Sequence, residues 1–211
     1  MSDAIVSIVD YGAGNLHSLA KALEMPGTRV RIVRDAASAL ERSESQLLVL
    51  PGVGAFGLAA ETLAPARDAI RQAATDGFPI LGICLGMQLL FDRSDEGAGA
   101  GLGIIPGFVR RVRAKRVPQI GWNTVSAAPD SGNGEMMSLV AYYANSFVCE
   151  PRDPGTVTAW TTYETDRFPA SVVAGPNDNV IGVQYHPEKS SADGVRHLRA
   201  LVSRVGGVKL A

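Results

Sequence analysis

Short apolar runs alternate along the first half of the chain with segments whose apolar residues recur every three or four positions. The runs have the length and branched content of buried strands, and they lie at residues 5–10, 30–33, 47–50 and 80–83. Between them, a stripe of Leu16, Leu19 and Leu23 predicts a helix. Asp35 can cap a short second helix, and residues 58–76 predict a third. This alternation implies right-handed crossovers and a doubly wound, mostly parallel α/β sheet.

The pattern changes between residue 103 and about residue 173. Alternating, strand-like runs such as FVRRVRA, VTAWTTY and ASVVAG are separated there by Pro, Gly and Asn, so we expect an antiparallel extension of the sheet. A last apolar strand at residues 180–185 precedes a helix that Ser191 can cap, and this helix should turn four apolar residues inward: Val195, Leu198, Val202 and Val205. No repeat or linker divides the chain, and residues 1–211 are expected to form a single domain.

Composition narrows the range of functions. The chain has 211 residues, enough for one α/β domain with a large core. A net charge of -1 gives no electrostatic footprint for nucleic acid or for an anionic membrane. The start MSDAIVSIVD does not resemble a signal peptide, and no apolar run reaches the ~20 residues that span a bilayer. With only 2 Cys, the sequence predicts a reducing, cytoplasmic location.

One cysteine stands where a strand pattern changes directly into a helix pattern. Residues 80–83 predict a buried strand, Cys84 follows, and residues 85–90 predict a helix. Gly82 and Gly86 remove the side chains that would block a sharp corner, which predicts a nucleophile elbow with sulfur in place of oxygen. The adjacent helix N-terminus would favour a thiolate. The alternative is a buried structural cysteine, the usual state of a lone Cys.

A histidine and a glutamate leave the end of another predicted strand. That strand covers residues 180–185, and the tripeptide His-Pro-Glu follows at residues 186–188. Side chains two positions apart in an extended segment point the same way, so Glu188 can orient His186 as a general base. The carboxyl ends of parallel strands meet at one sheet edge, which would bring this pair to Cys84. The alternative is a surface loop in which the two residues have no joint role.

The remaining histidines and the second cysteine give no competing site. His17 and His197 lie in helical patterns off the apolar stripes, and we expect both to be solvated. Cys149 lies in the strand-like stretch YYANSFVCE and is expected to be a small buried hydrophobe.

A glycine-rich loop, PGVGAFG, follows the predicted strand at residues 47–50. Gly52 and Gly54 allow the loop to bend so that its backbone N–H groups point into the cleft, as an oxyanion hole requires. Alone, such a loop is more often a simple turn or a phosphate cradle. Together with an elbow cysteine and a strand-end His-x-Glu, it indicates nucleophilic catalysis.

Two other functions compete with this interpretation. Residues 12–14, Gly-Ala-Gly, with Asp35 downstream suggest the dinucleotide fingerprint G-x-G-x-x-G, but its third glycine position is His17, which disfavours it. This loop is more plausible at the border of the active site or on a partner surface. A catalytically silent α/β domain would lack one of the three chemical elements, and all three are present. A related cysteine hydrolase acting on another amide stays open.

Three segments, PGVGAFG, GICLGMQLLF and GVQYHPEKSS, resemble in order and spacing those of the class I, triad-type glutamine amidotransferases. The stretches IVDYGAGNLHSL, GLGIIPG and VPQIGWN make the chain similar, more narrowly, to the glutaminase subunits of imidazole glycerol phosphate synthase in histidine biosynthesis. The resemblance runs from about residue 5 to residue 201. Glutaminase subunits of other amidotransferases and independent cysteine amidases remain the alternatives.

The resemblance implies the reaction and its residues. L-glutamine would be hydrolysed to glutamate and ammonia through a thioester on Cys84, with His186 and Glu188 completing the triad. Backbone N–H groups of Val53 and Leu85 would form the oxyanion hole. Five residues would contact the substrate, with no metal or cofactor involved: Gly52, Gly54, Gln88 and the backbone of Ser146 and Phe147. On the residues alone, Gln88 could equally be a simple helix-surface side chain.

The resemblance also implies a partner, because ammonia released into water at neutral pH would be protonated and lose its nucleophilic lone pair. That partner is a (β/α)8-barrel synthase in a heterodimer. Four residues match interface positions of the family: Asn15, Trp122, Tyr142 and Lys189. Each also fits ordinary packing or solvation. Asn145 and Gln119 stand where the family usually has histidines, and both differences bear on the arrangement of the interface and of the rim of the glutamine pocket.

Overall fold

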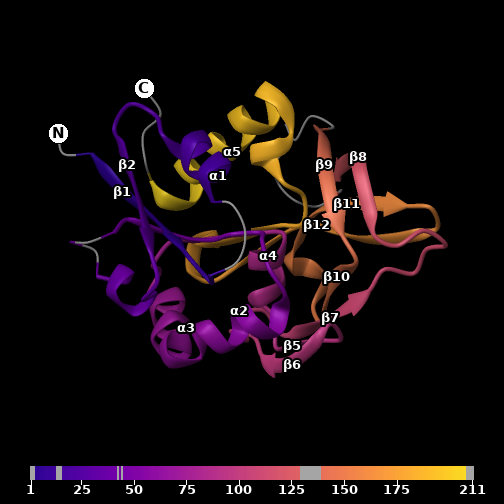
Figure 1. Cartoon of the computed structure of the whole chain (residues 1–211), viewed down its shortest axis with the longest axis horizontal. Helices are drawn as coiled ribbons and strands as arrows, with labels where there is room; N and C mark the ends of the chain where they lie inside the picture. Colours follow the sequence, from indigo (N-terminus) through magenta and orange to yellow (C-terminus); the bar gives the residue numbers. More distant parts are fainter. Residues whose placement is uncertain (1–2, 13–15, 42, 44, 129–138, 208–211) are drawn as a thin grey trace.

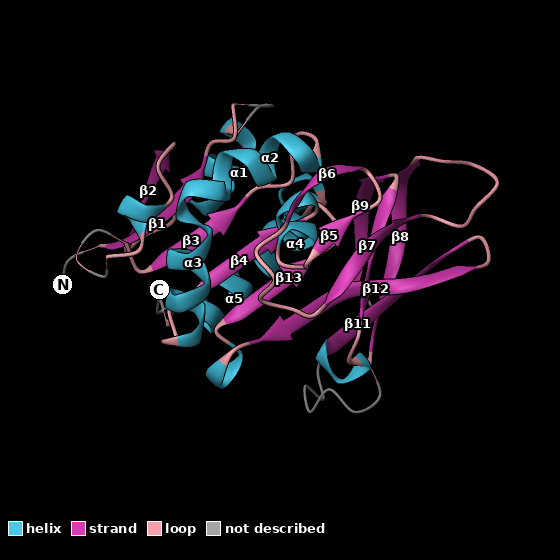
Figure 2. Ribbon diagram, turned by 90° about the horizontal axis from the view of Figure 1, so that it is seen from below, coloured by secondary structure: helices cyan, strands magenta, loops and turns pink. Residues whose placement is uncertain are grey.

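The computed structural model describes residues 3–12, 16–41, 43, 45–128 and 139–207. Within them, the main sheet has nine strands in the order β2-β1-β3-β4-β13-β12-β11-β8-β9. The first five are parallel to one another, as predicted, and cross the molecule side by side (Figure 2). Their bounds are β1 (Ala4–Val9), β2 (Thr28–Val33), β3 (Leu47–Leu50), β4 (Ile80–Ile83) and β13 (Val180–Val183).

The other four strands of this sheet are antiparallel, which confirms the predicted extension. They are β12 (Asp166–Ala174), β11 (Val157–Tyr163), β8 (Gln119–Ala127) and β9 (Leu139–Asn145). The run FVRRVRA does not join them, and here the prediction is wrong. It supplies β7 to a second, four-stranded sheet whose members are β10 (Phe147–Pro151), β7 (Gly107–Arg111), β5 (Arg93–Ser94) and β6 (Gly97–Ala100).

Helices cover both faces of the parallel strands (Figure 1). On one face lie α1 (His17–Leu23) and α5 (Ser191–Gly206), and on the other lie α2 (Phe56–Leu63), α3 (Arg67–Thr75) and α4 (Leu85–Leu89). Side chains alternate across a strand. Accordingly, Leu47 and Val49 of β3 join the core under α1 and α5, whereas Leu48 and Leu50 join the core under the other three. The doubly wound prediction is confirmed.

Two helix predictions need correction. The segment 58–76 is not one helix, because Pro65 lies in a 3-10 turn at Ala64–Ala66 that separates α2 from α3, as expected where proline lacks an N–H donor. Ser191 does not cap α5. It is the first residue of that helix and has a φ of 59°, and no side chain caps the helix start.

Other details match the sequence pattern. Asp35 accepts a hydrogen bond from the backbone N–H of Ala37 at the start of the 3-10 turn Ala37–Ala39, although the residue at the cap position is Ala36. Leu198, Val202 and Val205 are buried, and Val195 is partly buried against the same core. None of the helices described here has the length and apolar character needed to cross a membrane.

Candidate active site

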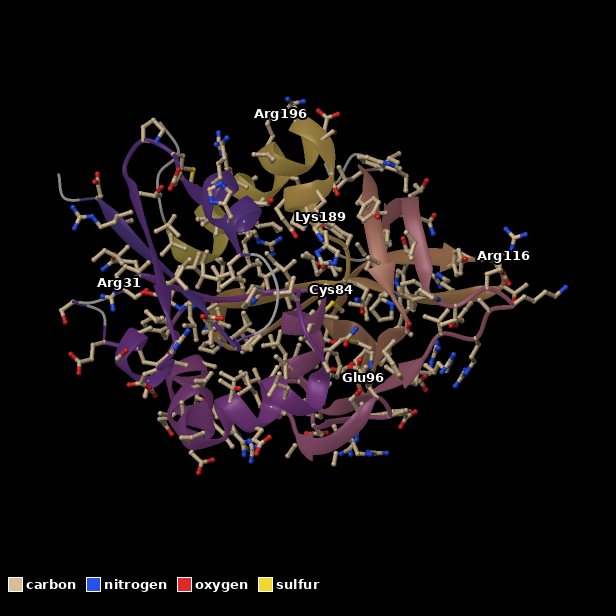
Figure 3. All side chains as sticks on the ribbon, in the orientation of Figure 1. Arg31, Cys84, Glu96, Arg116, Lys189 and Arg196 are labelled. Carbon is tan, nitrogen blue, oxygen red and sulfur yellow. The ribbon has the colours of Figure 1, made fainter. Side chains whose placement is uncertain are left out.

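Cys84 occupies a sharp corner between β4 and α4, near the middle of the molecule (Figure 3). Its φ of 47° and ψ of -103° lie outside the regions that non-glycine residues favour. Both neighbouring glycines are required by close approach. A Cβ on Gly86 would lie 1.9 Å from the carbonyl oxygen of Leu50, and one on Gly82 would lie 2.6 Å from the carbonyl carbon of Gly86. Strain of this kind persists only where the surroundings enforce it, as at functional sites.

His186 lies at the same sheet edge because β13 is the parallel neighbour of β4. The backbone N–H of Cys84 donates to the carbonyl oxygen of Val183 at 2.7 Å, which aligns the ends of the two strands. The Nδ1 atom of His186 lies 2.9 Å from Oε1 of Glu188, and both side chains are almost fully buried. With Nδ1 donating to this carboxylate, Nε2 is the nitrogen that can exchange a proton with the thiol.

Opposing influences set the charge of His186. Burial lowers its pKa, but the neighbouring Cys84 thiolate and the Glu188 carboxylate outweigh burial and raise the pKa to about 10. Near neutral pH, these influences therefore favour the protonated imidazolium form of His186. An imidazolium in this position carries the proton that a leaving group needs.

The PGVG loop packs directly against this pair. A Cβ on Gly52 would lie 2.9 Å from both the Cβ of Cys84 and the Cε1 of His186, so only glycine fits there. Gly54 has a φ of 111°, a conformation that favours glycine. Val53, between them, packs partly buried against the core cluster that contains Cys84. Leu85 is the first residue of α4, and the first N–H groups of a helix have no partner within it.

Gln88 lies one turn along α4 from Cys84 and is buried. Its Nε2 donates to the carbonyl oxygen of Phe147 at 3.0 Å and to Oε1 of Gln184 at 3.3 Å. Ser146 and Phe147 lie where β9 passes into β10, and the Ser146 carbonyl accepts a hydrogen bond from Val112 at 2.9 Å. The structure thus brings Gln88 and Phe147 together beside the elbow.

The predicted interface residues lie on the strands and loop next to this site. Trp122 is 55% exposed and meets Tyr142 edge to face, with ring centroids 6.1 Å apart. Ile120 and Val140 extend the exposed apolar surface of β8 and β9. Lys189 is exposed, and its backbone N–H donates to the His186 carbonyl. Asn15, the remaining interface residue, lies outside the described residues.

The two residues that depart from the family pattern face each other. Gln119 of β8 and Asn145 of β9 are cross-strand partners, and both are buried. Among the residues that the structure describes, neither the Gln119 Oε1 nor the Asn145 Oδ1 has a hydrogen-bond partner. Asn145 Nδ2 donates to the Phe147 carbonyl at 3.2 Å. Gln119 and Asn145 therefore lie together in the wall next to Phe147.

The prediction for His197 is wrong. Its Nε2 lies 2.7 Å from the hydroxyl of Tyr185, and burial lowers its pKa. The helix pattern placed it off the apolar stripe, but α5 lies over the end of β13 and presents it to Tyr185. Cys149 is buried, as predicted, and burial raises its pKa.

Sequence reasoning missed three polar residues around the site. Gln184 donates from Nε2 to Cys84 Sγ at 3.5 Å. Ser190 accepts from the Tyr142 N–H at 2.8 Å. Glu96, from the β5–β6 hairpin, accepts from the Phe56 N–H at the start of α2, just after the PGVG loop. Of these three residues, the sequence pattern could have indicated Gln184, because it is the polar residue within the apolar run VIGVQY.

Comparison with known proteins places the chain in a family. The family model for glutamine amidotransferase class-I matches residues 7–202. The chain therefore belongs to the class I glutamine amidotransferases. As a member it is an enzyme of the glutaminase type.

Two proteins that are similar to this chain over nearly its full length have the same name. The imidazole glycerol phosphate synthase subunit HisH of Halobacterium salinarum is 45% identical over 94% of this chain and 93% of that protein. The protein of the same name from Pyrococcus furiosus is 40% identical, over 92% of this chain and 96% of its own length.

Solved structures share the fold. A glutamine amidotransferase crystal structure matches with a TM-score of 0.72 at 20% identity, covering 96% of this chain and 99% of that one. PurLQS from Thermotoga maritima matches with a TM-score of 0.69 at 20% identity, covering 95% of this chain and 98% of that one. At this identity the likeness bears on the fold alone.

Proposed function

We propose that this chain is the glutaminase subunit of imidazole glycerol phosphate synthase, with Cys84, His186 and Glu188 as its triad. The observation that carries the proposal is the buried bond between His186 and Glu188 beside a cysteine held in a strained strand-to-helix corner. Near full-length similarity to HisH proteins supports the particular synthase. Two cores on opposite faces of one sheet support residues 1–211 as a single domain.

In the proposed reaction, Cys84 acts as a thiolate and His186 as an imidazolium beside it. The Cys84 thiolate attacks the side-chain amide carbon of glutamine, and the carbonyl oxygen becomes an oxyanion. The backbone N–H groups of Val53 and Leu85 stabilise that charge. His186 then gives its proton to the departing nitrogen, and ammonia leaves a glutamyl thioester. Water, deprotonated by His186, attacks the thioester carbonyl and releases glutamate, which returns the proton to the pair.

The substrate would lie against Gln88 and the loop at Gly52 and Gly54. Both Nε2 hydrogens of Gln88 are engaged, so the atom it can offer a ligand is Oε1, an acceptor suited to the α-ammonium group. The backbone at Ser146 and Phe147 forms the neighbouring wall, which is suited to the α-carboxylate through N–H groups. This arrangement would bind the amino-acid end and leave the amide end to Cys84.

Ammonia would pass to a (β/α)8-barrel synthase in a heterodimer. The apolar surface of Ile120, Trp122 and Val140, with the exposed Lys189 nearby, supports an interface on this side of the site. Asn15 would belong to the same interface. A cytoplasmic location fits two cysteines that are both free.

Substitution of the nucleophile tests the proposal. Cys84→Ala should remove almost all glutamine-dependent synthesis by the complex, because triad residues act as a unit. Ammonia supplied directly should still support synthesis, since the partner's own site is untouched. Glutamine hydrolysis by Cys84→Ala at the wild-type rate would exclude Cys84 as the nucleophile.

A further inference from the structure

Gln184 is a fully buried polar side chain that the reaction described above does not use. It directly follows β13, two residues before His186, and its backbone N–H donates to the carbonyl of Ala170 at 2.9 Å. Because β13 and β4 are parallel and in register through Val183 and Ile83, Gln184 stands level with Cys84 on the adjacent strand. The sheet therefore fixes its carboxamide beside the sulfur.

The orientation of this carboxamide follows from its neighbours. The Phe147 carbonyl can only accept, so the atom of Gln88 that faces it is the Nε2 donor, at 3.0 Å. The same Nε2 lies 3.3 Å from Gln184, which must therefore present its oxygen there. The other end of Gln184, its Nε2, then points at Cys84 Sγ, at 3.5 Å. The Phe147 carbonyl, which can only accept, therefore fixes which end of the Gln88 carboxamide is the donor, and through it the orientation of Gln184.

A donor in this position acts on the charge of the sulfur. A hydrogen bond made to the charged form of an acid favours that form and lowers its pKa. Gln184 has no exposed surface, so water cannot replace the bond when the side chain is removed. The imidazolium of His186 would stabilise a Cys84 thiolate by its charge, and the Gln184 amide would stabilise it by a hydrogen bond.

We propose that Gln184 is the hydrogen-bond donor that holds Cys84 as a thiolate, and that it links the nucleophile to Gln88 at the substrate site. The inference rests on the proposed function only in taking Cys84 as the nucleophile. Gln184 positions the sulfur while the imidazole is occupied with proton transfer. An amino acid bound at Gln88 could then affect the Cys84 sulfur through the carboxamide of Gln184, which is hydrogen-bonded to both.

The test is the pH dependence of Cys84 alkylation by iodoacetamide in the full chain, followed by mass spectrometry of the Cys84 peptide so that Cys149 does not contribute. Gln184→Met keeps the side-chain volume and removes the donor. In this variant the pH midpoint of Cys84 alkylation should rise by about one pH unit, which corresponds to about tenfold less thiolate at any pH below the midpoint. Gln184→Glu should raise it further, because a carboxylate would face the thiolate. Unchanged midpoints in both variants would overturn the proposal.

Asn179 provides a matched control. It is a buried carboxamide next to the other end of β13, and its Nδ2 donates to the carbonyls of Ala74 and Phe78. Asn179→Ala loses comparable hydrogen bonds and should leave the alkylation midpoint at the wild-type value. A rise equal to that of Gln184→Met would show general loosening of the strand and would also overturn the proposal.

A measurement on the unsubstituted protein covers the case in which Gln184→Met does not fold. The side-chain amide resonances of Gln184 should shift with pH at the same midpoint as Cys84 alkylation, and this shift should vanish in Cys84→Ser. No shift in the wild-type protein would contradict the bond. Neither readout requires glutamine, so absence of glutaminase activity would count against the proposed function and not against this inference.

Discussion

His186 and Tyr142 are joined through their backbones: the N–H of His186 donates to the carbonyl of Tyr142 at 2.8 Å. Ser190 closes the connection, since its Oγ accepts from the Tyr142 N–H at 2.8 Å and donates to the His186 carbonyl at 2.6 Å. Tyr142 belongs to β9, the last strand of the sheet, and its ring meets the exposed Trp122. A partner that docks on β8 and β9 would therefore act on Tyr142, whose backbone is hydrogen-bonded to that of His186, the proposed general base.

Ser190→Ala tests this connection. Loss of the hydroxyl leaves the Tyr142 N–H without its acceptor, which typically costs about 1–3 kcal/mol of stability, while the His186 carbonyl keeps the hydrogen bond from the Lys189 N–H. We expect stimulation of glutaminase activity by the synthase to fall about tenfold, within the usual range of coupling between sites. Steady-state assays with and without the synthase measure this. Ser38→Ala removes an exposed hydroxyl remote from the site and should behave as wild type. Equal stimulation of both variants would rule the connection out.

The titration of His186 gives a second prediction. Burial lowers the pKa of His186, and Cys84 with Glu188 raises it to about 10, so NMR should find its midpoint near that value. In Cys84→Ala the midpoint should fall, because the thiolate is the stronger of the two raising groups. A midpoint unchanged by this substitution would show that the thiolate is not its neighbour in solution.

The sign of the associated stability follows from linkage. The folded pKa lies above the ordinary value of 6.5, so protonation of His186 stabilises the folded state. This contribution is fully present below pH 6.5 and is lost as the pH rises through about 10.

Much of the candidate site could be predicted from the residues that follow each apolar strand. An apolar run that ends in a cysteine between glycines, and another that ends in His-Pro-Glu, are brought to one edge because parallel strands share a direction. Gln184 does not follow from it, since its partners Cys84 and Gln88 are distant in sequence and only the register of β4 with β13 places them together. Hydrophobic periodicity also could not assign β7 to a separate sheet, because the partner of a strand is decided by tertiary packing and not by its own sequence pattern.

The third prediction separates the base from its orienter. His186→Ala should be nearly as damaging as loss of Cys84, because His186 is the proposed proton donor to the leaving nitrogen. Glu188→Gln should keep part of the activity, since an amide oxygen can still accept from Nδ1 while the negative charge is lost. Glutaminase kcat for the two variants decides the order. Near-wild-type activity of both would show that His-Pro-Glu is only a loop.

We propose that the PGVG loop controls the activity of the site. Gly52 and Gly54 flank Val53, so its peptide can turn toward or away from Cys84. A missing oxyanion donor costs about 2.7 to 4 kcal/mol, a hundred- to a thousandfold in rate. An ammonia donor that depends on its partner would keep this N–H turned away until the synthase docks.

Glutaminase turnover of the isolated chain, measured beside that of the chain saturated with the (β/α)8-barrel synthase and its ligand, tests the central claim most directly. The chain alone should hydrolyse glutamine poorly, and the loaded synthase should raise kcat by about a hundred- to a thousandfold. Lys189→Ala or Trp122→Ala should reduce this rise more than the basal rate. Full activity of the isolated chain, unchanged by the synthase, would contradict the account and favour an independent amidase.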